Sequence, residues 1–151
     1  MRFLFFLLLV TFVSANTLEI TAKNFYHKEG EKKAVFSGNA VANDGTNLIK
    51  ADKIIIYLDE NNEAIKYEAR NRVYFELKDA KKFVKGKCNI LIYLPNEDKY
   101  ILKGNVALND VLNKRKVFGD EVIYDNKHHN SIAKSLSNKP VKFIFKVKST
   151  K

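Results

Sequence analysis

The sequence predicts an all-β fold, and three observations support this prediction. Short runs of apolar or alternating residues, rich in β-branched and aromatic side chains, recur along the chain. Polar turns rich in Asn and Asp separate these runs, although the chain has only 6 Gly and 2 Pro. No long stretch combines a helical period with capping residues. Strands separated by turns about every 8–12 residues are typical of a sandwich or a barrel-like fold.

The expected strands differ in how many of their faces are apolar. In residues 18–22, apolar and polar side chains alternate as in a half-buried strand. Residues 73–77 and 141–147 alternate in the same way, with their apolar side chains on one face. Residues 54–58 and 90–94 are apolar on both faces, which suits strands that are covered on both sides. This pattern leaves open which side chains of residues 54–58 face inward.

Polar turns are expected at residues 43–45, 59–62, 95–98 and 125–127, where apolar runs end. Asn and Asp tolerate the left-handed backbone conformation that Gly usually supplies. Because Gly is scarce, we expect Asn to take this role.

A weak repeat of about 33 residues links these elements. Four motifs recur at intervals of 32, 34 and 33 residues between their Asn residues: Gly38-Asn39-Ala40-Val41, Asn71-Arg72-Val73, Gly104-Asn105-Val106 and Asn138-Lys139-Pro140-Val141. A fixed period indicates one supersecondary unit stacked on itself. Such a stack has an open strand edge at each end unless the sheet closes.

The first 15 residues read as a signal peptide. Met1-Arg2 gives a positive start, residues 3–13 are apolar, and Val13-Ser14-Ala15 offers small residues before a cleavage site. The apolar run is shorter than the roughly 20 residues that a spanning helix needs. We therefore expect cleavage after Ala15, a single mature domain over residues 16–151, and a location outside the cytoplasm.

The composition excludes several classes of protein. The chain has 151 residues, 46% of them hydrophobic, which fits one globular domain. Its single cysteine, Cys88, excludes an internal disulfide framework and a multi-cysteine zinc site. His128 and His129 are adjacent, so on a strand they would point to opposite faces rather than share a metal ion. We expect no enzyme activity, metal or cofactor, although an enzyme with two carboxylates converging in a cleft stays open.

The net charge of +10 favours an anionic partner. Many of the cations lie in expected turns, including Lys32-Lys33, Lys81-Lys82 and Lys114-Arg115-Lys116. One candidate function is therefore a secreted β-module that binds polyanions through lysine-rich turns. The opposing interpretation is that charged turns only keep a β-protein soluble.

The ordered motifs resemble those of a known family. The family's Gly-Asn-Val, Ala-Asp-Lys and Gly-Asp runs recur here in the same order, at residues 35–41, residues 49–57, Tyr100–Leu108 and Val117–Tyr124. The resemblance extends from about Leu18 to Val147. The family is that of the LptA/OstA-like periplasmic lipopolysaccharide-transport proteins. This chain departs from the pattern at Asn71-Arg72-Val73, where the family has Gly-Asn-Val.

The resemblance implies a bent antiparallel β-jelly roll with open edge strands at both ends. It also implies a non-enzymatic periplasmic carrier that takes lipopolysaccharide from the inner to the outer membrane. Its partners would be the lipid A moiety, inner- and outer-membrane transport components and further copies joined head to tail, with no nucleic acid. The acyl chains would lie in an apolar groove.

Two sets of residues follow from this interpretation. The expected groove residues, which plain core packing would also explain, are Leu18, Ile20, Phe36, Ile54, Ile56, Phe75, Leu91 and Ile123. The expected partner-binding edge residues are Leu18, Ile20, Val141, Phe143 and Phe145.

Overall fold

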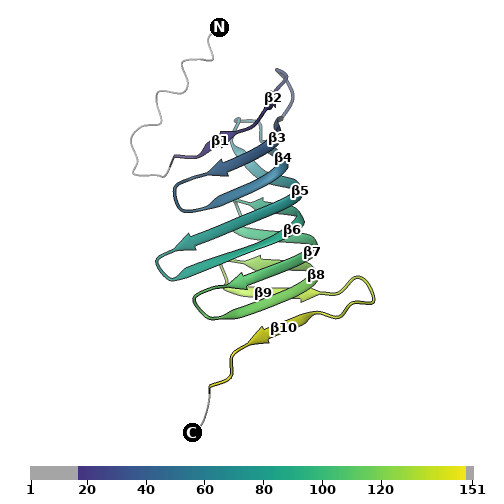
Figure 1. The fold of residues 1–151 in the computed structure, drawn as a ribbon. Coiled ribbons are helices and arrows are strands. Elements are labelled where there is room, and N and C mark those ends of the chain that lie inside the picture. Colours follow the sequence, from purple (N-terminus) through teal and green to yellow (C-terminus); the bar gives the residue numbers. More distant parts are fainter. Residues whose placement is uncertain (1–16, 149–151) are drawn as a thin grey trace.

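The computed structural model describes residues 17–148, which form one antiparallel sheet of ten strands (Figure 1). The strands are β1 (Glu19–Thr21), β2 (Asn24–Tyr26), β3 (Lys33–Asn43), β4 (Leu48–Leu58), β5 (Ala64–Asp79), β6 (Lys82–Leu94), β7 (Lys99–Asp110), β8 (Arg115–Asp125), β9 (Asn130–Lys134) and β10 (Lys142–Phe145). Strands β3 to β8 pair in sequence order. At one end β1 and β2 both pair with β3, and at the other β9 and β10 both pair with β8.

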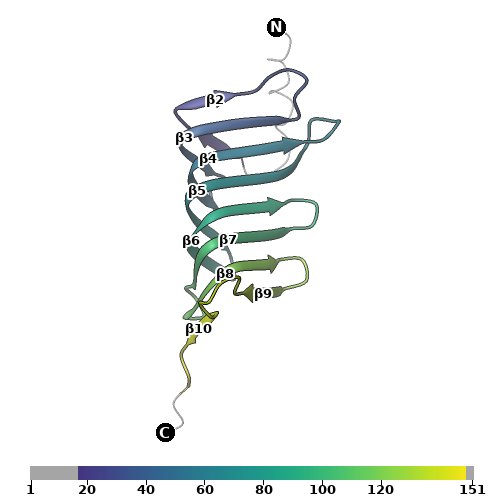
Figure 2. The same ribbon diagram turned by 90° about the vertical axis from the view of Figure 1, so that its right-hand side faces the viewer.

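The sheet is bent into two halves that face each other (Figures 1 and 2). The pairing register shifts in mid-strand at each ladder from β3–β4 to β7–β8, for example between Arg70 and Val73 of β5. The first half-sheet contains residues 33–37, 53–58, 64–70, 90–94, 99–103 and 121–125 with β2 and β9. The second half-sheet contains residues 40–43, 48–51, 73–79, 82–88, 106–110 and 115–119 with β1 and β10.

Pairs of left-handed residues make these bends in β3, β5 and β7. Their φ angles are 88° and 49° at Gly38-Asn39, 69° and 52° at Asn71-Arg72, and 84° and 48° at Gly104-Asn105. A side chain at Gly104 would meet the Asn89 side chain at 2.5 Å, so close packing as well as backbone conformation requires glycine there. Three of the four recurring Asn motifs therefore lie at bends, whereas the fourth, from Asn138, lies between β9 and β10.

The core lies between the half-sheets and is tightest at the bend. There it is lined by the small side chains of Ala40, Ala51, Val73, Cys88 and Val106, each at most 5% exposed. Away from the bend, the inward row of the first half-sheet contains Phe36, Ile54, Ala69, Leu91, Leu102, Val122 and Ala133. The facing row of the second half-sheet contains Ile20, Ala42, Ile49, Phe75, Gly86, Leu108, Val117 and Phe143.

The structure confirms the all-β prediction and the open edges at both ends. It also decides the orientation of residues 54–58: Ile54 and Ile56 face inward, whereas Ile55 and Tyr57 face outward. The expected signal peptide, residues 1–15, lies outside the described residues. Within the described part of the chain, no helix is long and apolar enough to cross a bilayer.

Candidate functional site

An apolar groove runs along the sheet between the two half-sheets. Its larger part is a cavity of about 650 Å³ beneath β5 to β10, lined by apolar side chains such as Phe75, Leu108 and Val117. A smaller cavity of about 280 Å³ lies toward the N-terminal strands. Leu77 and Tyr100 line both cavities, so the two cavities adjoin between the half-sheets.

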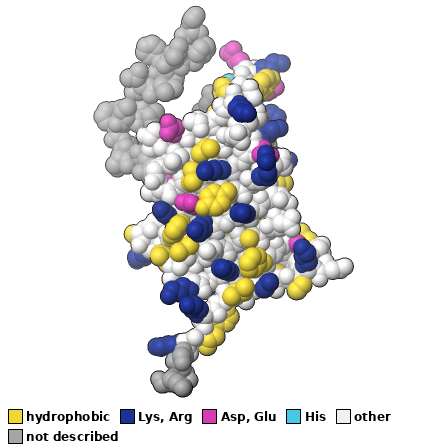
Figure 3. All heavy atoms as spheres, in the orientation of Figure 1, with side chains coloured by type: hydrophobic (Ala, Val, Ile, Leu, Met, Phe, Trp, Pro, Cys, Tyr) yellow, Lys and Arg dark blue, Asp and Glu magenta, His cyan; other side chains and the backbone are white. Residues whose placement is uncertain are grey.

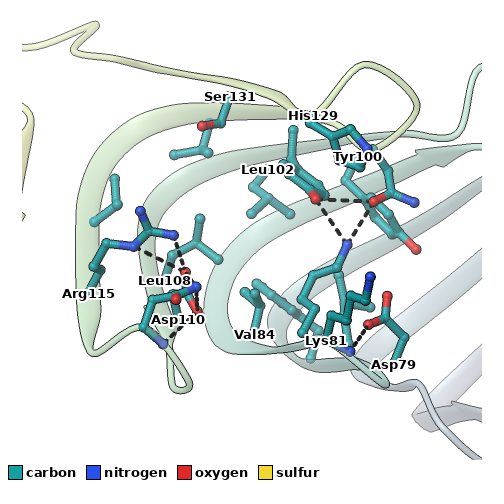
Figure 4. Close-up of a pocket in the computed structure, with 18 of the residues that line it drawn as sticks. Asp79, Lys81, Val84, Tyr100, Leu102, Leu108, Asp110, Arg115, His129 and Ser131 are labelled. Carbon is teal, nitrogen blue, oxygen red and sulfur yellow. Dashed lines mark hydrogen bonds and ion pairs between the residues drawn. The ribbon is translucent and has the colours of Figure 1, made fainter.

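The groove is closed at the bend and open on the side where the strands end in turns. The first rim consists of the turns of the first half-sheet, residues 59–63, 95–98 and 126–129. The second rim consists of the turns of the second half-sheet, residues 44–47, 80–81 and 111–114. In Figure 4, Tyr100 and His129 lie on one side of the larger cavity, and Asp79 and Lys81 lie opposite them.

A row of four tyrosines lines the groove near the first rim. Tyr67, Tyr93, Tyr100 and Tyr124 are direct cross-strand neighbours, with ring centroids 6.1, 4.5 and 6.5 Å apart in that order. Burial is the main cause that raises the pKa of Tyr93 to about 12. The negative charge of Asp98, and the hydrogen bond that Tyr93 donates to it, add to the rise. Burial also raises the pKa of Tyr100. Tyr93 and Tyr100 therefore offer flat apolar rings with neutral hydroxyl groups.

One lysine bridges the two rims. Lys82, on the second half-sheet, donates hydrogen bonds from Nζ to the Tyr124 hydroxyl at 3.0 Å and to Asn126 Oδ1 at 2.7 Å, both on the first half-sheet. The same ammonium lies 4.6 Å from the centroid of the Tyr124 ring. Asn126 is held in turn by a 2.8 Å hydrogen bond from its Nδ2 to Asp98 Oδ2. Because Lys82 belongs to one half-sheet and Tyr124 to the other, this contact spans the open side of the groove.

A second cation faces the cavity at the turn between β7 and β8. Arg115 pairs with Asp110 at 2.7 Å, and Asn113 donates to the same carboxylate (Figure 4). Burial alone would raise the pKa of Asp110, but hydrogen bonds from Asn113 and Arg115 outweigh it and lower the pKa. The carboxylate is thus ionised at neutral pH and fixes the guanidinium at the second rim.

Most of the expected groove residues lie on the inner face. Phe36, Ile54, Phe75 and Leu91 belong to the core or pack against it, and Leu18 lines the smaller cavity. Ile20 and Ile56 occupy inward positions opposite Ala42 and Tyr67.

Ile123 lies on the outer face instead of in the groove. It pairs with Ile101 and Ile132 there, and its neighbour Val122 faces the cavity. Residues 122–124 are apolar on both faces, so alternation does not reveal which one points inward. Sequence reasoning also did not assign Lys82 or the tyrosine row to the groove. Tyr93 lies two residues after Leu91 and so on the same face of β6, which is the local signal that could have found it.

The expected edge residues lie at the two ends of the sheet. Leu18 precedes β1 and Ile20 lies within it, whereas Val141 precedes β10. Phe143 and Phe145 of β10 are 51% and 55% exposed, with ring centroids 5.3 Å apart. Phe143 also lines the larger cavity, so the groove extends to this edge.

The cysteine is buried, whereas His27, His128 and His129 are exposed. Burial raises the pKa of the Cys88 thiol to about 12, which keeps it protonated and unreactive. His128 contacts Asp125 at 2.8 Å in an exposed turn. Among residues 17–148, no group of three or more His, Cys, Asp or Glu side chains is arranged to hold a metal ion.

These features define a β-jelly-roll protein whose folded sheet encloses an apolar groove. Residues 19–130 match the model of the family described as LptA/(LptD N-terminal domain) LPS transport protein, and the chain belongs to this family. The resemblance seen in the sequence is thereby confirmed.

The fold is also found in a solved structure. The crystal structure of LptH from Pseudomonas aeruginosa superposes with a TM-score of 0.76 at 16% sequence identity, covering 87% of this chain and 96% of LptH. That protein is described as the LptA-homologous periplasmic component of the conserved lipopolysaccharide transport device. No curated protein sequence matches this chain.

Proposed function

We propose that this protein is a non-enzymatic periplasmic carrier that binds lipopolysaccharide by its acyl chains and passes it toward the outer membrane. The observation that carries the proposal is the apolar groove, with its two adjoining cavities, in a member of a lipopolysaccharide-transport family. The periplasmic location rests on the family, on the periplasmic LptH and on the signal-peptide pattern of residues 1–15.

The acyl chains supply the binding energy in this proposal. Each methylene transferred from water into an apolar site contributes about 0.8 kcal/mol. The groove offers aliphatic walls from both half-sheets, with Leu102 and Val122 on one side and Leu108 and Val117 on the other. A chain lying along the strand-stacking direction would contact these walls over several strands.

The phosphorylated headgroup stays at the open side. Arg115 and Lys81 line the larger cavity at the second rim, where a guanidinium and an ammonium suit phosphate oxygens. The hydroxyl groups of the tyrosine row lie near the opposite rim and suit the polar atoms at the base of an acyl chain.

The open edges join copies or partner domains head to tail. The inward row from Ile20 of β1 to Phe143 of β10 crosses the second half-sheet from one edge to the other. Pairing β10 of one molecule with the N-terminal edge of the next by strand addition would therefore continue the groove. The exposed Phe25 and Phe145 at the two ends are the apolar surfaces such a junction would cover.

Site-specific photo-crosslinking tests whether lipid lies in the groove. A photoreactive phenylalanine analogue at Tyr100, which faces the cavity, should crosslink to lipopolysaccharide in cells. The matched control is Ile101, its direct neighbour on the outer face. Equal crosslinking at both positions, or none at Tyr100 in a folded protein, would contradict a lipid-filled groove.

The proposed signal peptide has its own test. Intact-mass measurement of protein released by osmotic shock should give a chain that begins at Asn16. A chain that retains Met1, or one left with the cytoplasmic fraction, would overturn the periplasmic assignment.

A further inference from the structure

The outer face of the second half-sheet carries a set of lysines that the groove does not use. By register they point away from the core: Lys50 and Lys87 lie in one cross-strand row with Lys142, and Lys85 and Lys116 lie in the next. Lys78 faces outward opposite Phe83. We call these six lysines, with Tyr74, Phe83 and Phe118 between them, the basic face (Figure 3).

The charge of the basic face is not neutralised within the protein. None of its six lysines takes part in an ion pair among the residues that the structure describes. Glu76 is the one acidic residue within these rows from β4 to β10, and it accepts a hydrogen bond from the Tyr74 hydroxyl. On the outer face of the first half-sheet two cations are paired, since Glu68 pairs with Arg70 at 2.7 Å and Glu121 lies 4.0 Å from Lys134. Lys53 and Lys103 on that face have no ion pair among the described residues.

Three of the six lysines of the basic face lie over aromatic rings. Lys78 Nζ lies 4.8 Å and Lys85 Nζ 5.9 Å from the centroid of the Phe83 ring, and Lys142 Nζ lies 5.4 Å from that of Phe118. Ammonium groups above apolar rings and aliphatic stems form an amphipathic surface, with charge outermost and apolar atoms beneath. Such a surface suits the boundary between headgroups and acyl chains in a bilayer.

We propose that the basic face binds peripherally to an anionic phospholipid bilayer. Its lysines are spread over β4, β5, β6, β8 and β10, so the charge covers a broad sheet face and matches an extended plane of phosphates. A single-stranded nucleic acid would need several free rings on which bases stack, whereas two of the three rings, Phe83 and Phe118, are already covered by ammonium groups.

This site is separate from the groove. The basic face is on the opposite side of the second half-sheet from Phe75, Leu108 and Val117, so a membrane bound there leaves the groove and both rims free. The inference therefore goes beyond the carrier function and does not depend on it. Its consequence is that the protein can rest against a membrane leaflet with its groove facing away.

Vesicle co-sedimentation of the purified protein tests the proposal. We expect binding to phosphatidylcholine–phosphatidylglycerol vesicles and not to pure phosphatidylcholine vesicles, with release at high salt. The double variant Lys85→Gln/Lys87→Gln should bind roughly 30-fold more weakly, which is about fivefold for each lysine. The matched control, Lys53→Gln/Lys103→Gln, removes two lysines from the outer face of the first half-sheet and should change binding less than about twofold.

Three results would overturn the inference. The first is equal binding to neutral and anionic vesicles, and the second is an equal loss in the two double variants. The third is a single-stranded oligonucleotide that competes with anionic vesicles at equal phosphate concentration, because this would assign the face to nucleic acid. Circular dichroism melts of both double variants confirm that each is folded before binding is compared.

Discussion

Filling the groove with a larger side chain should block lipid binding without unfolding the protein. Leu108 faces the 650 Å³ cavity from the middle of the second half-sheet. The variant Leu108→Trp adds about six heavy atoms to its wall, and we expect these to displace about three acyl methylenes. At about 0.8 kcal/mol each, the loss is about 2.4 kcal/mol, or roughly 60-fold in Kd.

The stability of this variant should move little, or rise, because the added ring fills existing space. Binding is measured by displacement of a fluorescent acyl probe by lipopolysaccharide, and stability by thermal melts. Asn109→Trp is the matched control, since it adds the same ring to the outer face next in sequence. Tight lipid binding by folded Leu108→Trp, or an equal loss in Asn109→Trp, would refute the reasoning.

Four further predictions concern the bends, the rims, the tyrosine row and the edge. Asn71→Gly should raise the free energy of unfolding by about 0.5–1 kcal/mol in urea titrations, because φ is 69° there. Lys82→Met should lower the melting temperature and speed loading of a fluorescent acyl probe, because it removes the bridge between the rims. Stability should fall as pH rises from about 10 to about 12, because the folded pKa of Tyr93 exceeds its unfolded value, and Tyr93→Phe should lessen the fall. Phe143→Pro should weaken self-assembly in light scattering and leave the monomer folded, because β10 is a terminal strand.

The strands could be predicted because their signal is local, whereas the positions of the bends in β3, β5 and β7 were not predicted, although Asn39, Asn71 and Asn105 lie there with positive φ. Alternation identified the apolar strands, and Asn marked positions that need a left-handed backbone. Asn71-Arg72 illustrates this, since both residues adopt positive φ at the bend of β5 although the family has Gly-Asn there. The exposed charge pair between Arg72 and Asp52, at 2.8 Å, ties this bend to β4.

The groove was only partly predictable because its contacts are not local. Ile123 and Val122 are both apolar, and only the register with β7 and β9 shows that Ile123 faces outward. Lys82 begins β6 directly after Lys81, and nothing in the neighbouring sequence indicates contact with Tyr124, 42 residues away. The six lysines of the basic face come from five strands and form one surface only after the sheet has assembled.

Native mass spectrometry of the purified protein tests the central claim most directly. The ligand is hexa-acylated lipopolysaccharide, and the control is the same glycan with its acyl chains removed and its phosphates kept. We predict a complex with the acylated form and at least a hundredfold weaker binding of the de-acylated form, which corresponds to the burial of about four methylenes. Equal binding of the two forms would contradict an acyl-binding groove and assign recognition to the surface lysines.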